Sequence, residues 1–62
     1  MVLKLGSKGE EVKELQEFLG LKADGDFGPK TETAVKEWQK KNGLTPDGVI
    51  GPKTLSKMGF LD

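Results

Sequence analysis

The phrase DGDFGPKT occupies residues 24–31, and the phrase DGVIGPKT occupies residues 47–54. Both belong to a longer repeat, because residues 12–31 and 35–54 are identical at 12 of 20 positions when the chain is shifted by 23 residues. Self-similarity at a fixed period indicates an internal duplication. We therefore expect a single domain over residues 1–62 in which one structural unit is built twice.

Apolar residues recur at helical spacing in each copy. The segments VKELQEFL (residues 12–19) and VKEWQKKN (residues 35–42) each place apolar side chains on one face and charged side chains on the other. A third, shorter copy of the pattern ends at Met58. The predicted fold class is all-α, a small three-helix domain with helices over about residues 8–19, 29–42 and 52–58.

Local signals set the ends of these helices. Ser7 and Glu10 have the spacing of a capping box, which predicts the start of the first helix. Gly20 and Gly43 occupy the positions where a left-handed residue ends a helix.

The repeated phrases predict one loop-to-helix corner that is used twice. Aspartate favours turns through hydrogen bonds to nearby backbone N–H groups, and proline is suited to the first position of a helix. The residues expected to shape these loops are Asp24, Gly28, Pro29, Asp47, Gly51 and Pro52. The aligned Gln16 and Gln39 are expected to bond to loop backbone, with Thr31 and Thr54 closing the same networks.

The composition argues against several kinds of protein. The chain has no cysteine and no histidine, so we expect no metal and no cofactor. Its ten basic residues are balanced by ten acidic ones, and all ten are lysine because the sequence has no arginine. This balance opposes nucleic-acid binding. No apolar run is long enough to span a membrane, and no secretory signal is visible at the N-terminus.

Catalysis is also disfavoured. Ser7 and Ser56 have no histidine to activate them, and three short helices offer little cleft in which two carboxylates could act. A calcium loop beginning at Asp24 fails, because Pro29 stands where the loop needs glycine and Val35 where it needs glutamate. No catalytic residue is therefore assigned.

The sequence resembles the peptidoglycan-binding domain family, the three-helix modules of bacterial and phage cell-wall hydrolases. The resemblance rests on LGSKGEEVKELQEFLG (residues 5–20), DGDFGPKTETAVKEWQKKNGL (residues 24–44) and DGVIGPKTL (residues 47–55). It implies a non-catalytic, monomeric module that anchors a cell-wall hydrolase to peptidoglycan, through the glycan strand or the stem peptide. It further implies a covalently linked catalytic domain, such as that of a phage endolysin, and action at the bacterial cell wall. Because no signal peptide is visible, we expect delivery by another route or as part of a longer protein.

Six residues are candidates for ligand contact. Each corner brings a lysine beside a helix N-terminus, a place that suits an anion such as a stem-peptide carboxylate. The first corner is favoured, because there the pair Asp26-Phe27 replaces Val49-Ile50. Trp38 either packs in the core or stacks on a sugar. The candidates are Asp26, Phe27, Lys30, Thr31, Trp38 and Lys53.

A rival interpretation is a protein–protein or pro-domain interaction module. The same fold resembles the pro-segment of secreted metalloproteases, but those inhibitory segments carry a metal-blocking cysteine that this chain lacks. A small helical DNA-binding domain is the third alternative, and the zero net charge opposes it.

Overall fold

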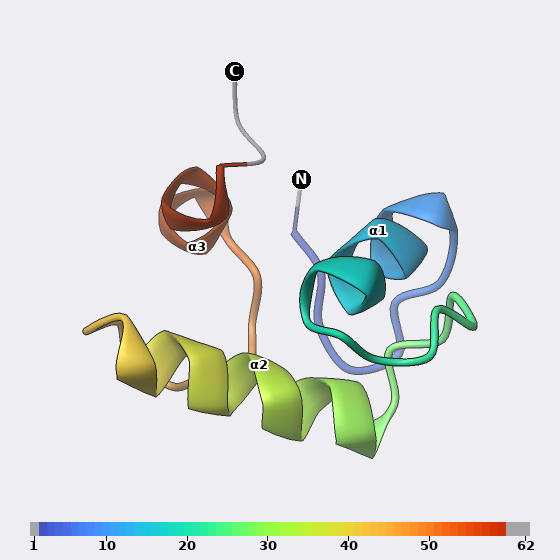
Figure 1. Cartoon of the computed structure of the whole chain (residues 1–62), viewed down its shortest axis with the longest axis horizontal. Helices are drawn as coiled ribbons and strands as arrows, with labels where there is room; N and C mark the ends of the chain where they lie inside the picture. The colour runs from blue at the N-terminus through green and yellow to red at the C-terminus, as the bar shows by residue number, and fades with distance from the viewer. Residues whose placement is uncertain (1, 60–62) are drawn as a thin grey trace.

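The computed structural model describes residues 2–59. It contains three helices in this range, α1 (Glu10–Phe18), α2 (Pro29–Lys41) and α3 (Pro52–Met58). α1 and α3 lie on the same side of α2, and the N-terminal segment runs between them (Figure 1). The all-α prediction is therefore confirmed. From their apolar character, Phe60 and Leu61 would be expected either to cover the core or to begin a linker, but both lie outside the described residues.

The capping-box prediction for the first helix is wrong. α1 begins at Glu10, after Gly9, whose φ of +126° is incompatible with a helical turn and which makes no side-chain cap. The hydroxyl of Ser7 instead accepts a hydrogen bond from the N–H of Lys4 at 3.0 Å and closes a turn before the helix. The predicted start near residue 8 is therefore early by about two residues.

The first two helices end in the same way. Gly20 and Gly43 follow the last turns with φ of +75° and +73°, which glycine adopts without a Cβ clash. The N–H of the next residue, Leu21 or Leu44, bonds at 2.8 Å to the carbonyl five residues earlier. This pattern satisfies carbonyls that the helix end would otherwise leave unpaired.

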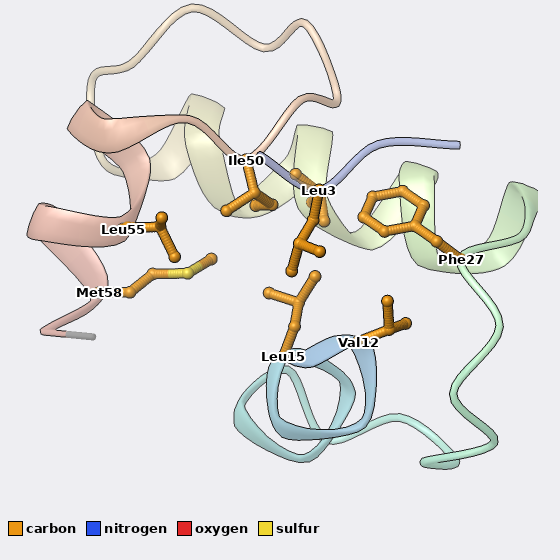
Figure 2. Close-up of a cluster of buried hydrophobic side chains, with 8 residues drawn as sticks. Leu3, Val12, Leu15, Phe27, Ile50, Leu55 and Met58 are labelled. Atoms are coloured by element: carbon orange, nitrogen blue, oxygen red, sulfur yellow. The ribbon is translucent and has the colours of Figure 1, made fainter. Parts of the chain in front are cut away.

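A compact apolar core lies between the helices and the two loop-to-helix corners, residues 24–31 and 47–54. Its members come from all three helices, from the corners and from the N-terminal segment, and Leu3, Leu15 and Ile50 point toward one another near its centre (Figure 2). Burial of side chains of this size stabilises the fold by about 1.5–3 kcal/mol each. The core residues, each no more than 8 % exposed, are Leu3, Val12, Leu15, Phe27, Val35, Ile50, Leu55 and Met58.

The N-terminal segment pairs with both corners. Leu3 and Ile50 exchange two backbone hydrogen bonds, of 3.0 and 2.7 Å. The N–H of Phe27 donates to the carbonyl of Ser7 at 2.9 Å, and the N–H of Gly6 donates to the carbonyl of Phe27 at 3.0 Å. One extended segment thus holds the equivalent residues of the two copies, Phe27 and Ile50, which both turn into the core.

No helix within residues 2–59 is long and apolar enough to cross a membrane.

The turn glycines provide a test of this packing. Gly48 has φ of +76°, and an added Cβ would lie 2.9 Å from Cγ of Glu32 on α2. Gly20 has nearly the same φ, +75°, with nothing within 4 Å of an added Cβ. Alanine at either site should cost at least about 1 kcal/mol, because the left-handed conformation strains any L side chain. We expect Gly48→Ala to lose clearly more than Gly20→Ala in urea unfolding, and equal losses would contradict the close contact between the second corner and α2.

Candidate functional site

A buried glutamine amide holds the first corner, defined as residues 24–31. The Oε1 atom of Gln16 accepts a hydrogen bond from the N–H of Gly25 at 2.9 Å. Its Nε2 atom lies 2.9 Å from Oδ1 of Asp24, 3.0 Å from the carbonyl oxygen of Asp26 and 3.1 Å from Oγ1 of Thr31. The two amide hydrogens are therefore shared among three acceptors. Since the side chain of Gln16 is only 2 % exposed, these bonds offset the cost of removing the amide from water.

The second corner, residues 47–54, repeats this network bond for bond. The Oε1 atom of Gln39 accepts from the N–H of Gly48 at 3.0 Å. Its Nε2 atom lies 3.1 Å from Oδ1 of Asp47, 2.9 Å from the carbonyl oxygen of Val49 and 3.2 Å from Oγ1 of Thr54. We call each network a glutamine clamp. Each clamp ties the end of one helix to the loop and first turn of the next.

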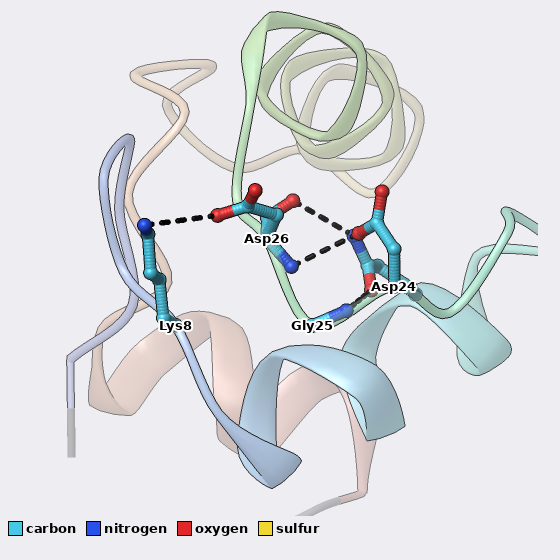
Figure 3. Close-up of polar contacts among 5 residues, drawn as sticks. Lys8, Asp24, Gly25 and Asp26 are labelled. Carbon is cyan, nitrogen blue, oxygen red and sulfur yellow. Dashed lines mark hydrogen bonds and ion pairs between the residues drawn. The ribbon is translucent and has the colours of Figure 1, made fainter.

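Each corner aspartate also closes a turn with its own loop. Oδ1 of Asp24 accepts the N–H of Asp26 at 2.9 Å, and Oδ1 of Asp47 accepts the N–H of Val49 at 2.9 Å. Figure 3 shows the carboxylate of Asp24 beside the backbone N–H of Asp26, with a dashed line for the bond between them. The Asp26 N–H, and after it the Gln16 amide, holds the pKa of Asp24 below its usual value of 3.8. Hydrogen bonds to the ionised form favour it, which gives this direction.

A shallow hollow opens at each corner and is lined in part by clamp residues. The hollow at the first corner has a volume of about 400 Å³. The hollow at the second corner has a volume of about 460 Å³. The residues that line the first are Asp24, Asp26, Gly28, Pro29, Lys30 and Thr31. The residues that line the second are Gln39, Leu44, Thr45, Asp47, Val49, Gly51, Pro52, Lys53 and Thr54.

Two of the six candidate ligand residues lie inside the protein. Phe27 is 2 % exposed and belongs to the core, so its side chain cannot reach a ligand at the surface. Thr31 is 4 % exposed, and its hydroxyl is occupied by the clamp. Phe27 is therefore corrected to a core residue and Thr31 to a clamp residue. The wrong expectation for Phe27 came from the difference between the two loops. Phe27 and Ile50 hold equivalent positions in the two copies, and both are buried apolar side chains.

Three other candidates are exposed at the corners. Asp26 faces solvent and forms a loose ion pair with Lys8 at 3.8 Å (Figure 3). Lys30 and Lys53 are exposed and line the hollows of the first and second corner, respectively. Lys30 is thus placed beside two carboxylates, whereas Lys53 shares its hollow with one.

Trp38 has an intermediate position. Its ring is half-buried against the core, and it meets Phe18 in an edge-on arrangement with ring centroids 5.9 Å apart and an interplanar angle of 71°. Phe18 is 43 % exposed, although its helical spacing placed it on the apolar face of α1. The aromatic pair joins the end of α1 to α2, and neither ring lines a corner hollow.

The described residues contain no group of three or more His, Cys, Asp or Glu side chains placed to hold a metal ion.

The sequence analysis did not single out Leu44, Thr45 and Val49, which form part of the wall of the second hollow. Leu44 could have been found from its place directly after the helix-ending glycine, because that position fixes the path of the chain into the loop.

The clamps make a stability prediction. Gln16→Glu or Gln39→Glu places a second carboxylate against the corner aspartate and removes the amide donor. We expect each variant to lose more than about 2 kcal/mol of unfolding free energy at neutral pH. Lys41→Gln on the exposed face makes the same change in net charge and should change stability by less than about 0.5 kcal/mol. Urea unfolding followed by circular dichroism measures both, and similar small losses in all three variants would contradict the clamp.

The depressed pKa of Asp24 predicts a pH dependence. Its folded pKa lies below the usual value of 3.8, so the ionised form contributes stability above that value. The contribution is lost as pH falls through the folded pKa. We expect the parent chain to lose more stability than Asp24→Asn when the pH is lowered from about 6 to about 2. Parallel loss of stability in the two proteins would show that Asp24 is not the group responsible.

Comparisons with known proteins agree with this architecture. Residues 8–58 match the family described as "Putative peptidoglycan binding domain". A search among curated protein sequences gave no match. The endolysin of Burkholderia phage AP3 is 38 % identical to this chain, with a TM-score of 0.91, and the match covers 100 % of this chain and 27 % of the endolysin.

Two further solved structures are similar. A peptidoglycan-binding protein of Clostridioides difficile, solved with glutamine hydroxamate, is 44 % identical with a TM-score of 0.90 over 95 % of this chain and 40 % of that one. The SleB N-terminal domain is 38 % identical with a TM-score of 0.91, over 97 % of this chain and 90 % of that one. This chain thus spans under a third of the endolysin and nearly all of the SleB domain. It belongs to the peptidoglycan-binding domain family.

Proposed function

We propose that this chain is a non-catalytic module that binds peptidoglycan and anchors a covalently linked cell-wall hydrolase. The observation that carries the proposal is the family match over residues 8–58, together with the fold shared with an endolysin of which the chain covers only part. A module occupying 27 % of such an enzyme leaves the remaining length for a catalytic domain.

The chemistry of the corners supports binding rather than hydrolysis. Hydrolysis of a glycosidic bond by the usual route needs two carboxylates, one of them a proton donor with a raised pKa. The pKa of Asp24 is lowered rather than raised, so this carboxyl is unsuited to donate a proton. Oδ1 of Asp47 is occupied by hydrogen bonds from Gln39 and from the Val49 N–H. These side chains maintain the loops, and the open hollows beside them offer contact surface without a closed cleft.

The exposed candidates define a contact surface on this module. Lys30 and Lys53 supply positive charge at the two corners, and Asp26 supplies acceptor oxygens at the first. Trp38, half-buried against the core, offers part of an indole face for contact with the polymer. Affinity through so small a surface should be modest. Attachment beside a catalytic domain would nevertheless raise that domain's local concentration on the wall.

The test is co-sedimentation of the chain with purified insoluble sacculi, at low and at high salt, with chitin as the control polymer. We expect the chain to pellet with sacculi and to stay in solution with chitin. Salt should change binding by less than about tenfold, because the net charge is zero, whereas a protein with 6–10 phosphate contacts loses about 10³–10⁵ in affinity between 50 and 200 mM salt.

Matched variants sharpen the test. The double variant Lys30→Gln/Lys53→Gln removes both corner charges, and Lys40→Gln/Lys57→Gln makes the same charge change at exposed positions outside the hollows. We expect only Lys30→Gln/Lys53→Gln to pellet several-fold less with sacculi than the parent chain does. If the parent chain stays in the supernatant with sacculi, the proposal fails and the rival protein-docking module gains support.

A further inference from the structure

The second hollow differs from the first in the chemistry of its wall. Its lining includes the half-buried side chains of Leu44 and Val49 and the exposed ring of Pro52. At the first corner the place of Val49 is taken by Asp26, whose carboxylate joins that of Asp24 in the lining. The second hollow therefore has an aliphatic wall where the first has an additional negative charge.

The lysines at the two corners, Lys30 and Lys53, also differ in the number of negative charges around them. Neither Lys30 nor Lys53 takes part in the ion pairs found among residues 2–59, so both ammonium groups can meet a ligand. Among residues 2–59, two carboxylates line the hollow at Lys30 and one, that of Asp47, lines the hollow at Lys53. Asp47 is bonded to Gln39 Nε2 and to the Val49 N–H. Because like charges repel, an anionic ligand is better accommodated at the second corner.

We propose that the second corner is a binding site for the free carboxylate of a peptidoglycan stem peptide. Lys53 pairs with the carboxylate, while a short aliphatic side chain of the peptide, such as that of alanine, lies against Leu44 and Val49. The inference rests on the proposed function and names the half of the polymer that is recognised. It also reverses the preference for the first corner that the sequence suggested.

The lining favours the peptide over the glycan strand. Sugar rings are commonly held by flat aromatic side chains, and no aromatic side chain from residues 2–59 lines this hollow. Phe18 and Trp38 pair elsewhere, between α1 and α2. A small aliphatic wall with one cation at its rim instead matches a ligand made of methyl groups, amides and a carboxylate.

The experiment is a titration of the isotope-labelled chain with the synthetic tetrapeptide L-Ala-γ-D-Glu-L-Lys-D-Ala, followed by NMR. We expect amide shifts to concentrate at residues 44–54. The same peptide with both carboxylates amidated should bind about tenfold more weakly, and Lys53→Gln should lose about the same factor. Lys30→Gln, the equivalent change at the first corner, should bind like the parent chain.

A reciprocal exchange tests the role of the wall. Val49→Asp gives the second corner the carboxylate of the first, and we expect it to weaken tetrapeptide binding at least about tenfold. Asp26→Val makes the opposite change at the first corner and should leave binding at the second unaltered. Both substitutions keep the backbone groups of residues 26 and 49 that bond to the clamps.

The outcomes separate this inference from the proposed function. If the chain pellets with sacculi but the tetrapeptide gives no shifts, or gives them at residues 24–31, the function stands and the peptide site is overturned. The same holds if Lys53→Gln or amidation leaves the affinity unchanged. If the parent chain does not pellet with sacculi, the proposed function is overturned, whatever the tetrapeptide shows.

Discussion

A glutamine amide buried at each corner is the interaction on which the rest of the structure depends. An amide removed from water is costly unless all of its polar atoms find partners, so the loop must present a backbone N–H, a carboxylate, a carbonyl and a hydroxyl together. Gln16 and Gln39 each receive this set, and no polar side-chain atom buried in residues 2–59 lacks a partner. The repeated phrase is the sequence that supplies those partners in order.

The clamps explain how so small a chain positions its core. Each clamp fixes a loop in which one residue, Phe27 or Ile50, is turned inward, and the N-terminal segment then pairs with both. Three segments distant in sequence are thereby held around the buried apolar core of residues 2–59 without disulfides. Core and corners are coupled, because a loop released from its glutamine would also withdraw its inward residue.

The helices could be predicted because their signals are local. Apolar periodicity, Gly-Pro at the start and a left-handed glycine at the end fixed α2 and α3 to within about one residue of their ends. The pairing of Leu3 with Ile50 joins residues 47 positions apart, and no local pattern carries such a contact. The candidate site was harder still. Asp26 and Phe27 are neighbours in the loop, yet Asp26 is exposed and Phe27 is buried, and the loop sequence alone does not show which of the two side chains turns inward.

The duplication separates the requirements of folding from those of binding. Asp24 and Asp47, like Thr31 and Thr54, are the same in both copies because their side chains belong to the clamps. Residues 26 and 49 contribute only backbone groups to the clamps, so their side chains are free to differ. An aspartate and a valine there leave both networks intact and yet give the two hollows different charge and polarity. One corner geometry can therefore present two different surfaces, because the side chain at position 26 or 49 sets the charge of the hollow while only its backbone bonds to the clamp.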